Sequence, residues 1–386
     1  MGFTRLIYDI LLAFVLVLAI PIWFILNKKR GYYIGLKERL LIKKENLPEG
    51  AVWIHCASVG EIKTAMPIIE YVSSKKPVIL TVFSPRAYKF GKSLNIPTTF
   101  LPFDFSFLIK KFIKTYKPKV LIIEEAEFWF NLITVSSNYI PVLSMNTNIP
   151  KTIFVKPLLG SISTFIVKNE TDKEILKSSV EEAKIKVCGN LKLLSKVEEK
   201  KLDINFGGRK VIVAGSTHNP EEEIIFEIYR DLKDRDTILV VAPRHTERVR
   251  KIEILAEKIG LSYSLRSQTK DPKTDIYIID TIGELAFLYK YADVVFVGGT
   301  ISEVGGHNIF EPILSGKKVI IGYNYHKIKD LVEEAEKLGA VKIVKSKEEL
   351  KETIEKLLED GKLNVDIKNI QQKIFNCYIK EIERWI

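Results

Sequence analysis

The chain has 386 residues, which at roughly 150 residues per domain indicates two or three domains. Apolar residues make up 46% of it, with 21 glycines and 15 prolines, so disordered, collagen-like and low-complexity classes are excluded. The 59 lysines and arginines exceed the 48 acidic residues and give a net charge of +11. This surplus favours an anionic partner: a nucleic acid, an anionic lipid surface or a phosphorylated substrate.

An apolar segment lies near the start of the chain. Residues 10–26 carry no charged or strongly polar side chain, and as a helix they span on the order of 25 Å. Extension back to residue 6 brings the segment close to the roughly 30 Å of a bilayer core. A cleaved signal peptide and a buried core helix are the alternatives, but the segment lacks a small-residue cleavage site and is apolar all round. The sequence therefore predicts an uncleaved transmembrane helix over residues 6–26.

Basic residues flank this segment unevenly. Only Arg5 and the amino terminus precede it, whereas five basic residues follow it closely: Lys28, Lys29, Arg30, Lys37 and Arg39. Because the basic side of a membrane span stays in the cytoplasm, the sequence predicts a single-pass anchor with a cytoplasmic body.

The body alternates β-branched runs with amphipathic stretches. A first series predicts strands at 51–55, 78–83, 120–124, 140–144, 165–168 and 185–188, and helices at 61–73, 105–116 and 171–178. After a polar stretch at 195–205, a second series predicts strands at 210–214, 237–242, 276–279, 294–297 and 318–321, and helices at 220–233, 247–259, 282–289, 327–338 and 347–358. The strands are near-continuous apolar runs, which is typical of parallel sheets covered on both faces.

We therefore predict two doubly wound α/β domains, residues 27–198 and 199–362, with ligands at the carboxyl ends of the strands. Residues 363–386 read as a terminal helix, and the sequence does not say which domain it packs on.

Charged residues follow the strands of the first series. Glu61 comes in the first turn of a predicted helix, where its carboxylate either accepts a proton from a substrate hydroxyl or simply complements the helix dipole. Arg86 is placed to bind a carboxylate or phosphate, with a plain surface arginine as the alternative. Glu124, Glu125 and Glu127 end a buried strand, so we expect basic partners from a substrate or from a structural ion pair.

The second series has a glycine-rich stretch. Gly215 and Ser216 lead into a helix whose first N–H groups suit a phosphate, and Arg244 ends the next strand. The glycine pairs at 298–299 and 305–306 permit close approach of a ligand to the backbone, after which residues 307–311 start a helix that favours an anion. Glu311 can accept two hydrogen bonds from a ribose diol. A purely structural glycine turn is the alternative.

Several classes of site are disfavoured. The cysteines Cys56, Cys188 and Cys377 are odd in number and far apart, so the sequence predicts neither a disulfide framework nor a cysteine zinc site, and indicates a reducing compartment. The five histidines lack metal-ligand spacing, so no metal is expected. The lysines are spread over most helices, which argues against nucleic acid.

Taken together, the motifs resemble the 3-deoxy-D-manno-octulosonic acid (Kdo) transferases of lipopolysaccharide assembly. The resemblance covers nearly the whole chain. It rests, in order, on the N-terminal anchor, residues 35–40, 57–61, 125–129, 188–192, 214–218 and 243–245, and the glycine-rich stretch. The chain departs from the family pattern at Phe130, where a proline is usual, and at residues 84–86, which replace a threonine-rich run.

This resemblance implies a GT-B glycosyltransferase, with two Rossmann-like domains facing across a cleft. The first domain binds the acceptor, a lipid A precursor (lipid IVA), and the second binds the donor CMP-Kdo. The enzyme would be metal-independent and inverting, at the cytoplasmic face of a bacterial inner membrane and its anionic lipids. Another nucleotide sugar, or a non-catalytic membrane-anchored nucleotide or lipid binder, remains the alternative.

The resemblance also implies a role for particular residues. Glu61 would be the general base, with Arg86, Glu125 and Glu127 on the acceptor side or near the reaction centre. The CMP moiety would be held by Pro243, Arg244, Gly283, Glu284, Leu285, Ala286, Asn308, Ile309, Phe310 and Glu311. The backbone of the pocket would come from Gly215, Ser216, Gly305, Gly306 and His307.

Overall fold

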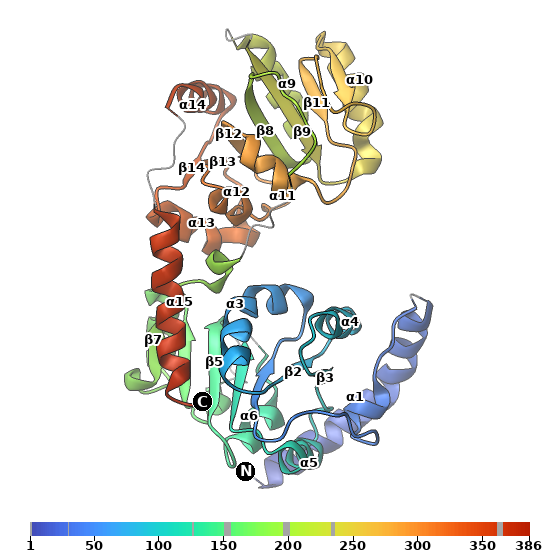
Figure 1. Ribbon diagram of the computed structural model, residues 1–386, viewed down its shortest axis with the longest axis vertical. Coiled ribbons are helices and arrows are strands. Elements are labelled where there is room, and N and C mark those ends of the chain that lie inside the picture. The colour runs from blue at the N-terminus through green and yellow to red at the C-terminus, as the bar shows by residue number, and fades with distance from the viewer. Residues whose placement is uncertain are drawn as a thin grey trace. The chain divides into compact units, whose positions relative to one another are not determined.

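The computed structural model describes residues 2–29, 31–125, 127–149, 156–195, 201–232, 236–360 and 366–386. The chain divides into two compact units (Figure 1): unit 1 is Met1–Ser195 with Asn369–Ile386, and unit 2 is Lys196–Lys368. The predicted domain limits at 198/199 and 362/363 lie outside the described residues.

Unit 1 begins with the helix α1 (Gly2–Lys29), which contains Pro21. Its part Phe3–Asn27 has a mean hydropathy of 2.7 and is long and apolar enough to cross a membrane. The short helix α2 (Leu36–Arg39) follows. The predicted helix over residues 6–26 is therefore confirmed as a helix.

A parallel sheet forms the centre of unit 1, with the strand order β3-β2-β1-β4-β5-β6-β7. Its strands are β1 (Val52–His55), β2 (Val78–Val82), β3 (Thr98–Phe100), β4 (Val120–Glu124), β5 (Val142–Thr147), β6 (Thr164–Val167) and β7 (Ile185–Val187). The strands predicted in this half are confirmed. The edge strand β3 was missed because three residues are too short to show a periodicity.

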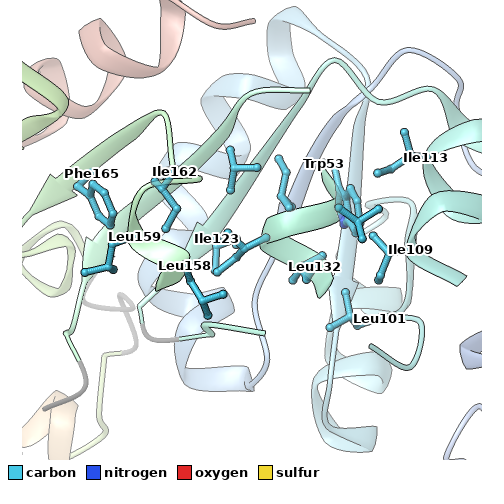
Figure 2. Packing of buried hydrophobic residues seen from close by; sticks show 14 of the residues in the cluster. Trp53, Leu101, Ile109, Ile113, Ile123, Leu132, Leu158, Leu159, Ile162 and Phe165 are labelled. Carbon is cyan, nitrogen blue, oxygen red and sulfur yellow. The ribbon is translucent and has the colours of Figure 1, made fainter. Parts of the chain in front are cut away.

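Helices cover both faces of this sheet: α3 (Val59–Lys75), α4 (Pro85–Ser93), α5 (Ser106–Tyr116), α6 (Phe130–Ser136), α7 (Lys156–Leu159) and α8 (Glu170–Lys177). Figure 2 shows part of the core, in which Trp53 of β1 lies near Ile109 and Ile113 of α5. The Trp53 ring lies 4.5 Å from that of Phe112, and its indole N–H donates to Thr81. The buried Trp53 therefore packs α5 against the sheet with its one polar atom satisfied.

The last helix, α15 (Ile367–Glu383), packs on unit 1 from Asn369 onward. The Phe375 ring lies 5.6 Å from that of Tyr71 on α3, and the Tyr378 hydroxyl donates to the Gly189 carbonyl. Cys377 is joined to Cys188 by a disulfide. The sequence predicted no disulfide framework, and this one bond was missed because a separation of 189 residues gave no sign that the end of the chain returns to β7. Cysteine content therefore no longer supports a reducing compartment.

Arg39 is fully buried in unit 1 and is not a surface charge beside the anchor, as the flank count assumed. Its guanidinium donates to the carbonyls of Ile34, Leu101 and Phe83 and lies 4.5 Å from the Phe100 ring. Desolvation lowers the pKa of Arg39 to about 9.

We expect Arg39→Lys to lower the free energy of unfolding by about 2–4 kcal/mol, because an ammonium group cannot reach three carbonyls in the planar fork of a guanidinium. Thermal and urea unfolding of the full chain measure this change. The neighbouring exposed Lys37, changed to Ala, is the control and should alter stability by less than about 0.5 kcal/mol. Equal effects of the two variants would contradict the prediction.

Unit 2 has its own parallel sheet, with the strand order β10-β11-β9-β8-β12-β13-β14. Its strands are β8 (Lys210–Thr217), β9 (Thr237–Pro243), β10 (Tyr263–Leu265), β11 (Ile276–Ile278), β12 (Val294–Val297), β13 (Val319–Ile321) and β14 (Val341–Ile343). The predicted strands are again confirmed. The missed strands β10 and β14 lie at the two edges and have only three residues each.

The helices of unit 2 are α9 (Glu221–Asp231), α10 (Val249–Ile259), α11 (Leu285–Leu288), α12 (Phe310–Leu314), α13 (Lys329–Lys337) and α14 (Lys347–Asp360). The helix predicted at 282–289 was too long, because Gly283 has a φ of 88° and the helix begins only at Leu285. The end predicted for the helix at 220–233 lies outside the described residues. The strand order reverses between β1 and β4 in unit 1 and between β8 and β12 in unit 2, and ligands of doubly wound sheets bind at such points.

Candidate active site

A carboxylate cluster, defined here as Glu61, Glu124, Glu125 and Glu127, lies at the carboxyl ends of β1 and β4. These neighbouring parallel strands are the ones at which the order of the unit 1 sheet reverses. The charges of these four carboxylates all act on the buried thiol of Cys56, whose pKa is raised by burial and then by the cluster. The structure therefore brings together the acidic residues that the sequence predicted at this edge.

Glu61 lies in the first turn of α3 and closes a capping box. Its carboxylate accepts hydrogen bonds from the Ala57 N–H at 2.7 Å and the Ser58 hydroxyl at 2.9 Å, and the Ser58 oxygen accepts from the Glu61 N–H. Desolvation nevertheless raises the pKa of Glu61, and the charge of Glu127 adds to the rise. The side chain is thus a fixed, half-buried carboxylate that binds a proton more readily than an ordinary glutamate.

Glu127 pairs with a histidine that the sequence did not single out as functional. His55 ends β1 and is fully buried, and its Nδ1 lies 3.0 Å from both oxygens of Thr81. Its Nε2 lies 3.7 Å from the Glu127 carboxylate, which also accepts a hydrogen bond from the Trp129 indole. Burial opposes ionisation of Glu127, but the His55 imidazole outweighs it and lowers the pKa.

The other two carboxylates differ in environment. Glu124 is fully buried, its pKa is raised by burial, and its carboxyl accepts a hydrogen bond from the Asn146 amide. Glu125 forms an ion pair with Lys192 at 3.2 Å, and its φ of 54° is one that L-residues rarely adopt. We expected basic partners for these acidic residues. For Glu125 that partner is a residue of the protein itself, Lys192.

Arg86 lies in the first turn of α4 and is exposed. Its Nε donates to the Tyr32 hydroxyl at 3.0 Å, and the guanidinium lies 5.5 Å from the Tyr32 ring. The structure thus gives Arg86 an aromatic partner, and a role near the reaction centre stays a prediction.

In unit 2 a buried carboxylate occupies the loop after β12. Glu221 is fully buried at the start of α9, and it accepts hydrogen bonds from the N–H groups of Gly299, Thr300, Ile301 and Ser302 at 2.8–3.2 Å. The His218 N–H, just before α9, donates to it as well. Glu221 therefore takes the N–H groups of Gly299 and of the three residues after it, which are not open to a ligand. The N–H groups of Glu221, Glu223 and Ile224 at the start of α9 donate instead to the carbonyls of His218 and Pro220. Phosphate binding at this helix start stays a prediction. Sequence patterning showed three glutamates here but not that Glu221 and Glu222 are buried and Glu223 is not.

An imidazole cluster, defined here as His218, His245 and His307, lies after β8, β9 and the glycine-rich loop. The rings of His218 and His307 are stacked at 5.1 Å with their Nε2 atoms 2.8 Å apart, and the His245 ring lies edge-on to His218 at 5.7 Å. Desolvation and then the neighbouring His218, Arg244 and Lys327 lower the pKa of His307 to about 4. The cluster is thus a set of imidazoles beside fixed positive charges, an environment that favours an anion.

The glycine pair at 305–306 shapes this loop. Both residues have a φ near 95° and both donate their N–H to the Gly299 carbonyl. A side chain at Gly305 would approach the His326 ring to 2.6 Å, so the tight turn requires glycine.

The structure also places the other residues expected to hold CMP. Arg244, Asn308 and Glu311 are exposed, and the Asn308 amide donates to the Glu311 carboxylate at 3.1 Å. Glu284 is engaged by Arg266 through two hydrogen bonds. The side chains of Pro243, Ile309 and Phe310 are buried, so these residues can offer a ligand only their backbone. Gly215 and Ser216 lie at the end of β8, Gly283 lies just before α11, and Leu285 and Ala286 lie at its start.

Comparison with known proteins identifies the family. Residues 35–195 match the model of the 3-deoxy-D-manno-octulosonic-acid transferases, and residues 169–374 match that of the group 1 glycosyl transferases. A 3-deoxy-D-manno-octulosonic acid transferase of Aquifex aeolicus is 33% identical over 89% of this chain and 96% of its own length. The chain belongs to the Kdo transferase family. A family member from Haemophilus influenzae is 29% identical over 81% of this chain and 80% of its own length.

Solved structures agree on the fold of this Kdo transferase family member. A glycosyltransferase from Rickettsia africae has a TM-score of 0.55 at 15% identity, over 88% of this chain and 98% of its own. The UDP-GlcNAc 2-epimerase of Neisseria meningitidis has a TM-score of 0.59 at 15% identity, over 85% and 99%. The chain is a glycosyltransferase with the two Rossmann-like halves of the GT-B fold, as predicted.

Proposed function

We propose that this enzyme transfers Kdo from CMP-Kdo to a lipid A precursor, lipid IVA, in lipopolysaccharide biosynthesis. The observation that carries the proposal is membership of the Kdo transferase family over nearly the whole chain, combined with a carboxylate cluster at the reversal point of the unit 1 sheet.

Glu61 is the general base in this proposal. It takes the proton from the attacking hydroxyl of the acceptor, so that substitution at the Kdo anomeric carbon proceeds with inversion. Its pKa, raised by desolvation, makes it a stronger base than an ordinary carboxylate. Glu125 and Glu127 bind the acceptor, and Glu127 is held in place by His55 and Trp129. Arg86 supports the reaction centre.

Unit 2 binds the donor in this proposal. Departure of CMP leaves charge on its phosphate. Arg244 supplies positive charge for it, and the imidazole cluster supplies N–H donors. The turn at 283–286 and residues 308–311 hold the nucleoside, and no metal takes part. Such a basic pocket also suits another nucleotide sugar, so donor identity needs its own test.

The enzyme works in this proposal at the cytoplasmic face of a bacterial inner membrane, where its lipid acceptor lies. The apolar helix α1 and the net charge of +11 support association with anionic lipids.

Two measurements test the function. Mass analysis of the product of CMP-Kdo and lipid IVA should show a gain of one or more Kdo units, and absence of any product would favour a non-catalytic binder. Competition among CMP, UMP and GMP should rank CMP first, and a preference for UMP or GMP would assign another nucleotide sugar.

We expect Ser58→Ala to move the acidic limb of the pH profile of kcat/KM to higher pH. The Ser58 hydroxyl stabilises ionised Glu61, so its loss raises the pKa of Glu61, and a base that must be deprotonated then becomes active only at higher pH. Ser84→Ala, which removes the matching cap of α4, is the control and should leave the profile in place. A shift in the control alone, or a shift of the limb to lower pH, would contradict the role of Glu61.

A further inference from the structure

The helix α1 contacts the rest of unit 1 near both of its ends, through Arg5, Tyr8 and Asp9 and through Trp23. Its half-buried positions recur every three or four residues, which is one face of a helix. They are Arg5, Tyr8, Leu12, Leu16, Ile20, Trp23 and Asn27, together with Asp9 beside Tyr8.

Polar contacts fix the first part of α1 to unit 1. The Asp9 carboxylate accepts hydrogen bonds from the N–H and hydroxyl of Ser106, at the start of α5, and from the Asn131 amide. The Tyr8 hydroxyl donates to the buried Asp104 at 2.8 Å, and the Arg5 guanidinium donates to the Thr134 carbonyl at 2.6 Å. Asp9, the acidic residue of this apolar helix, is thus hydrogen-bonded to α5 and α6 of unit 1.

The far part of α1 meets the same unit. The Trp23 ring stacks on Phe83, just after β2, at 6.4 Å, and it lies 5.1 Å from the buried Arg39 guanidinium. Tyr8 and Trp23 are about 22 Å apart along a helix axis at 1.5 Å per residue. If these two residues lay in opposite leaflets, the parts of unit 1 that contact them would also lie within the hydrocarbon. The polar groups of unit 1 make that position unfavourable.

The opposite face of α1 is apolar and uncovered in the described residues. It presents exposed large side chains without a charge: Phe3, Leu6, Ile7, Ile10, Leu11, Phe14, Val15, Val17, Leu18, Ile22, Ile25 and Leu26. The helix α5 lies beside the first part of α1 (Figure 1), where its Ser106 bonds to Asp9. It adds Phe107, which is 61% exposed, and the exposed Lys110, Lys111 and Lys114. An exposed apolar helix face, next to a helix that exposes lysines, fits the surface of an anionic membrane.

We propose that α1 is an in-plane anchor: one face packs on unit 1, the other enters a single leaflet, and the helix does not cross the membrane. The amino terminus then lies on the same side as the catalytic body, in contrast to the single-pass topology predicted from hydropathy. The occupant of the apolar face is a leaflet containing anionic lipid, and no part of this inference depends on the proposed donor or acceptor.

Topology gives the first test. A short Gly-Ser extension carrying one cysteine is placed before Met1, and Lys258→Cys on α10, whose side chain is 74% exposed, marks the body. Both are treated with a membrane-impermeant maleimide in spheroplasts and in inside-out vesicles. The unchanged chain is the blank, since Cys56 is buried and Cys188 and Cys377 are bonded. We expect both cysteines to react in the same preparation, and reaction in opposite preparations would overturn the proposal.

Depth gives the second test. Spin labels at successive positions from 10 to 26 are measured on the full chain bound to phosphatidylethanolamine–phosphatidylglycerol vesicles. We expect oxygen accessibility to oscillate with the helical period, high at Phe14 and Leu18 and low at Leu12 and Leu16, with no deepest point at the centre. A single depth maximum at mid-helix would show a span. Protection of Phe14 and Leu18 in a dimer without vesicles would assign the face to a second copy of the chain, and either result overturns the proposal.

Discussion

Replacing Glu61 by glutamine should lower the kcat of Kdo transfer by about 10²–10⁴-fold, the range that a positioned general base contributes. The amide oxygen still accepts one hydrogen bond of the capping box, so α3 keeps its start. CMP affinity should stay unchanged, because the nucleotide is assigned to unit 2. Steady-state kinetics and calorimetric titration with CMP measure the two effects.

The same variant decides between the two interpretations of this residue. If Glu61 only caps α3, Glu61→Gln costs about 1 kcal/mol of stability and leaves kcat near normal. Glu70→Gln, a change of the same chemistry on the same helix, is the matched control and should behave like the unchanged enzyme. Normal turnover of Glu61→Gln would remove the mechanism.

Replacing Glu221 by glutamine should disorganise the glycine-rich loop of unit 2. The amide keeps one acceptor oxygen and turns an NH₂ group toward buried N–H donors, here those of His218 and Gly299 or of Thr300 and its neighbours. Loss of the acceptor for two or more of these donors should cost about 3–5 kcal/mol of unfolding free energy. Because residues 305–311 follow the same loop, CMP affinity should fall by about tenfold or more, which corresponds to about 1.4 kcal/mol.

Amide hydrogen exchange locates this effect. Residues 299–302 should lose protection in Glu221→Gln, while the strands of unit 1 keep theirs. Glu223→Gln on the same helix turn removes only a surface ion pair with Lys258 at 3.9 Å and should change stability by less than about 0.5 kcal/mol. Unchanged exchange at 299–302 would show that the loop does not depend on Glu221.

The sequence predicted the sheets and the carboxylate cluster because both depend on local pattern. Buried parallel strands are apolar runs, and a charged residue directly after such a run falls at the edge where ligands bind, as Glu61, Glu125 and Glu127 do. The partners of these groups depend on residues far away in the chain. His55 with Glu127 and Glu221 with the 299–302 loop are pairs of this kind, and no spacing rule indicates them.

Hydropathy predicted the α1 helix but not its contacts. The length and composition of residues 6–26 are the same for a crossing helix and for one that lies on its own protein. Asp9, a charged residue at the edge of the apolar segment, was the local sign that one end had polar partners, here Ser106 and Asn131.

The chain enters unit 2 after Ser195 and leaves it before Asn369, so unit 2 is an insertion within unit 1. On the ribosome, unit 1 stays incomplete until unit 2 has been synthesised, because α15 and Cys377 emerge last. Deletion of the final twenty residues would therefore expose the surface beside β7 in the first-made unit, although the lost segment is remote from it in the gene. Residues 201–360, by contrast, form a continuous stretch that carries every strand of the second sheet.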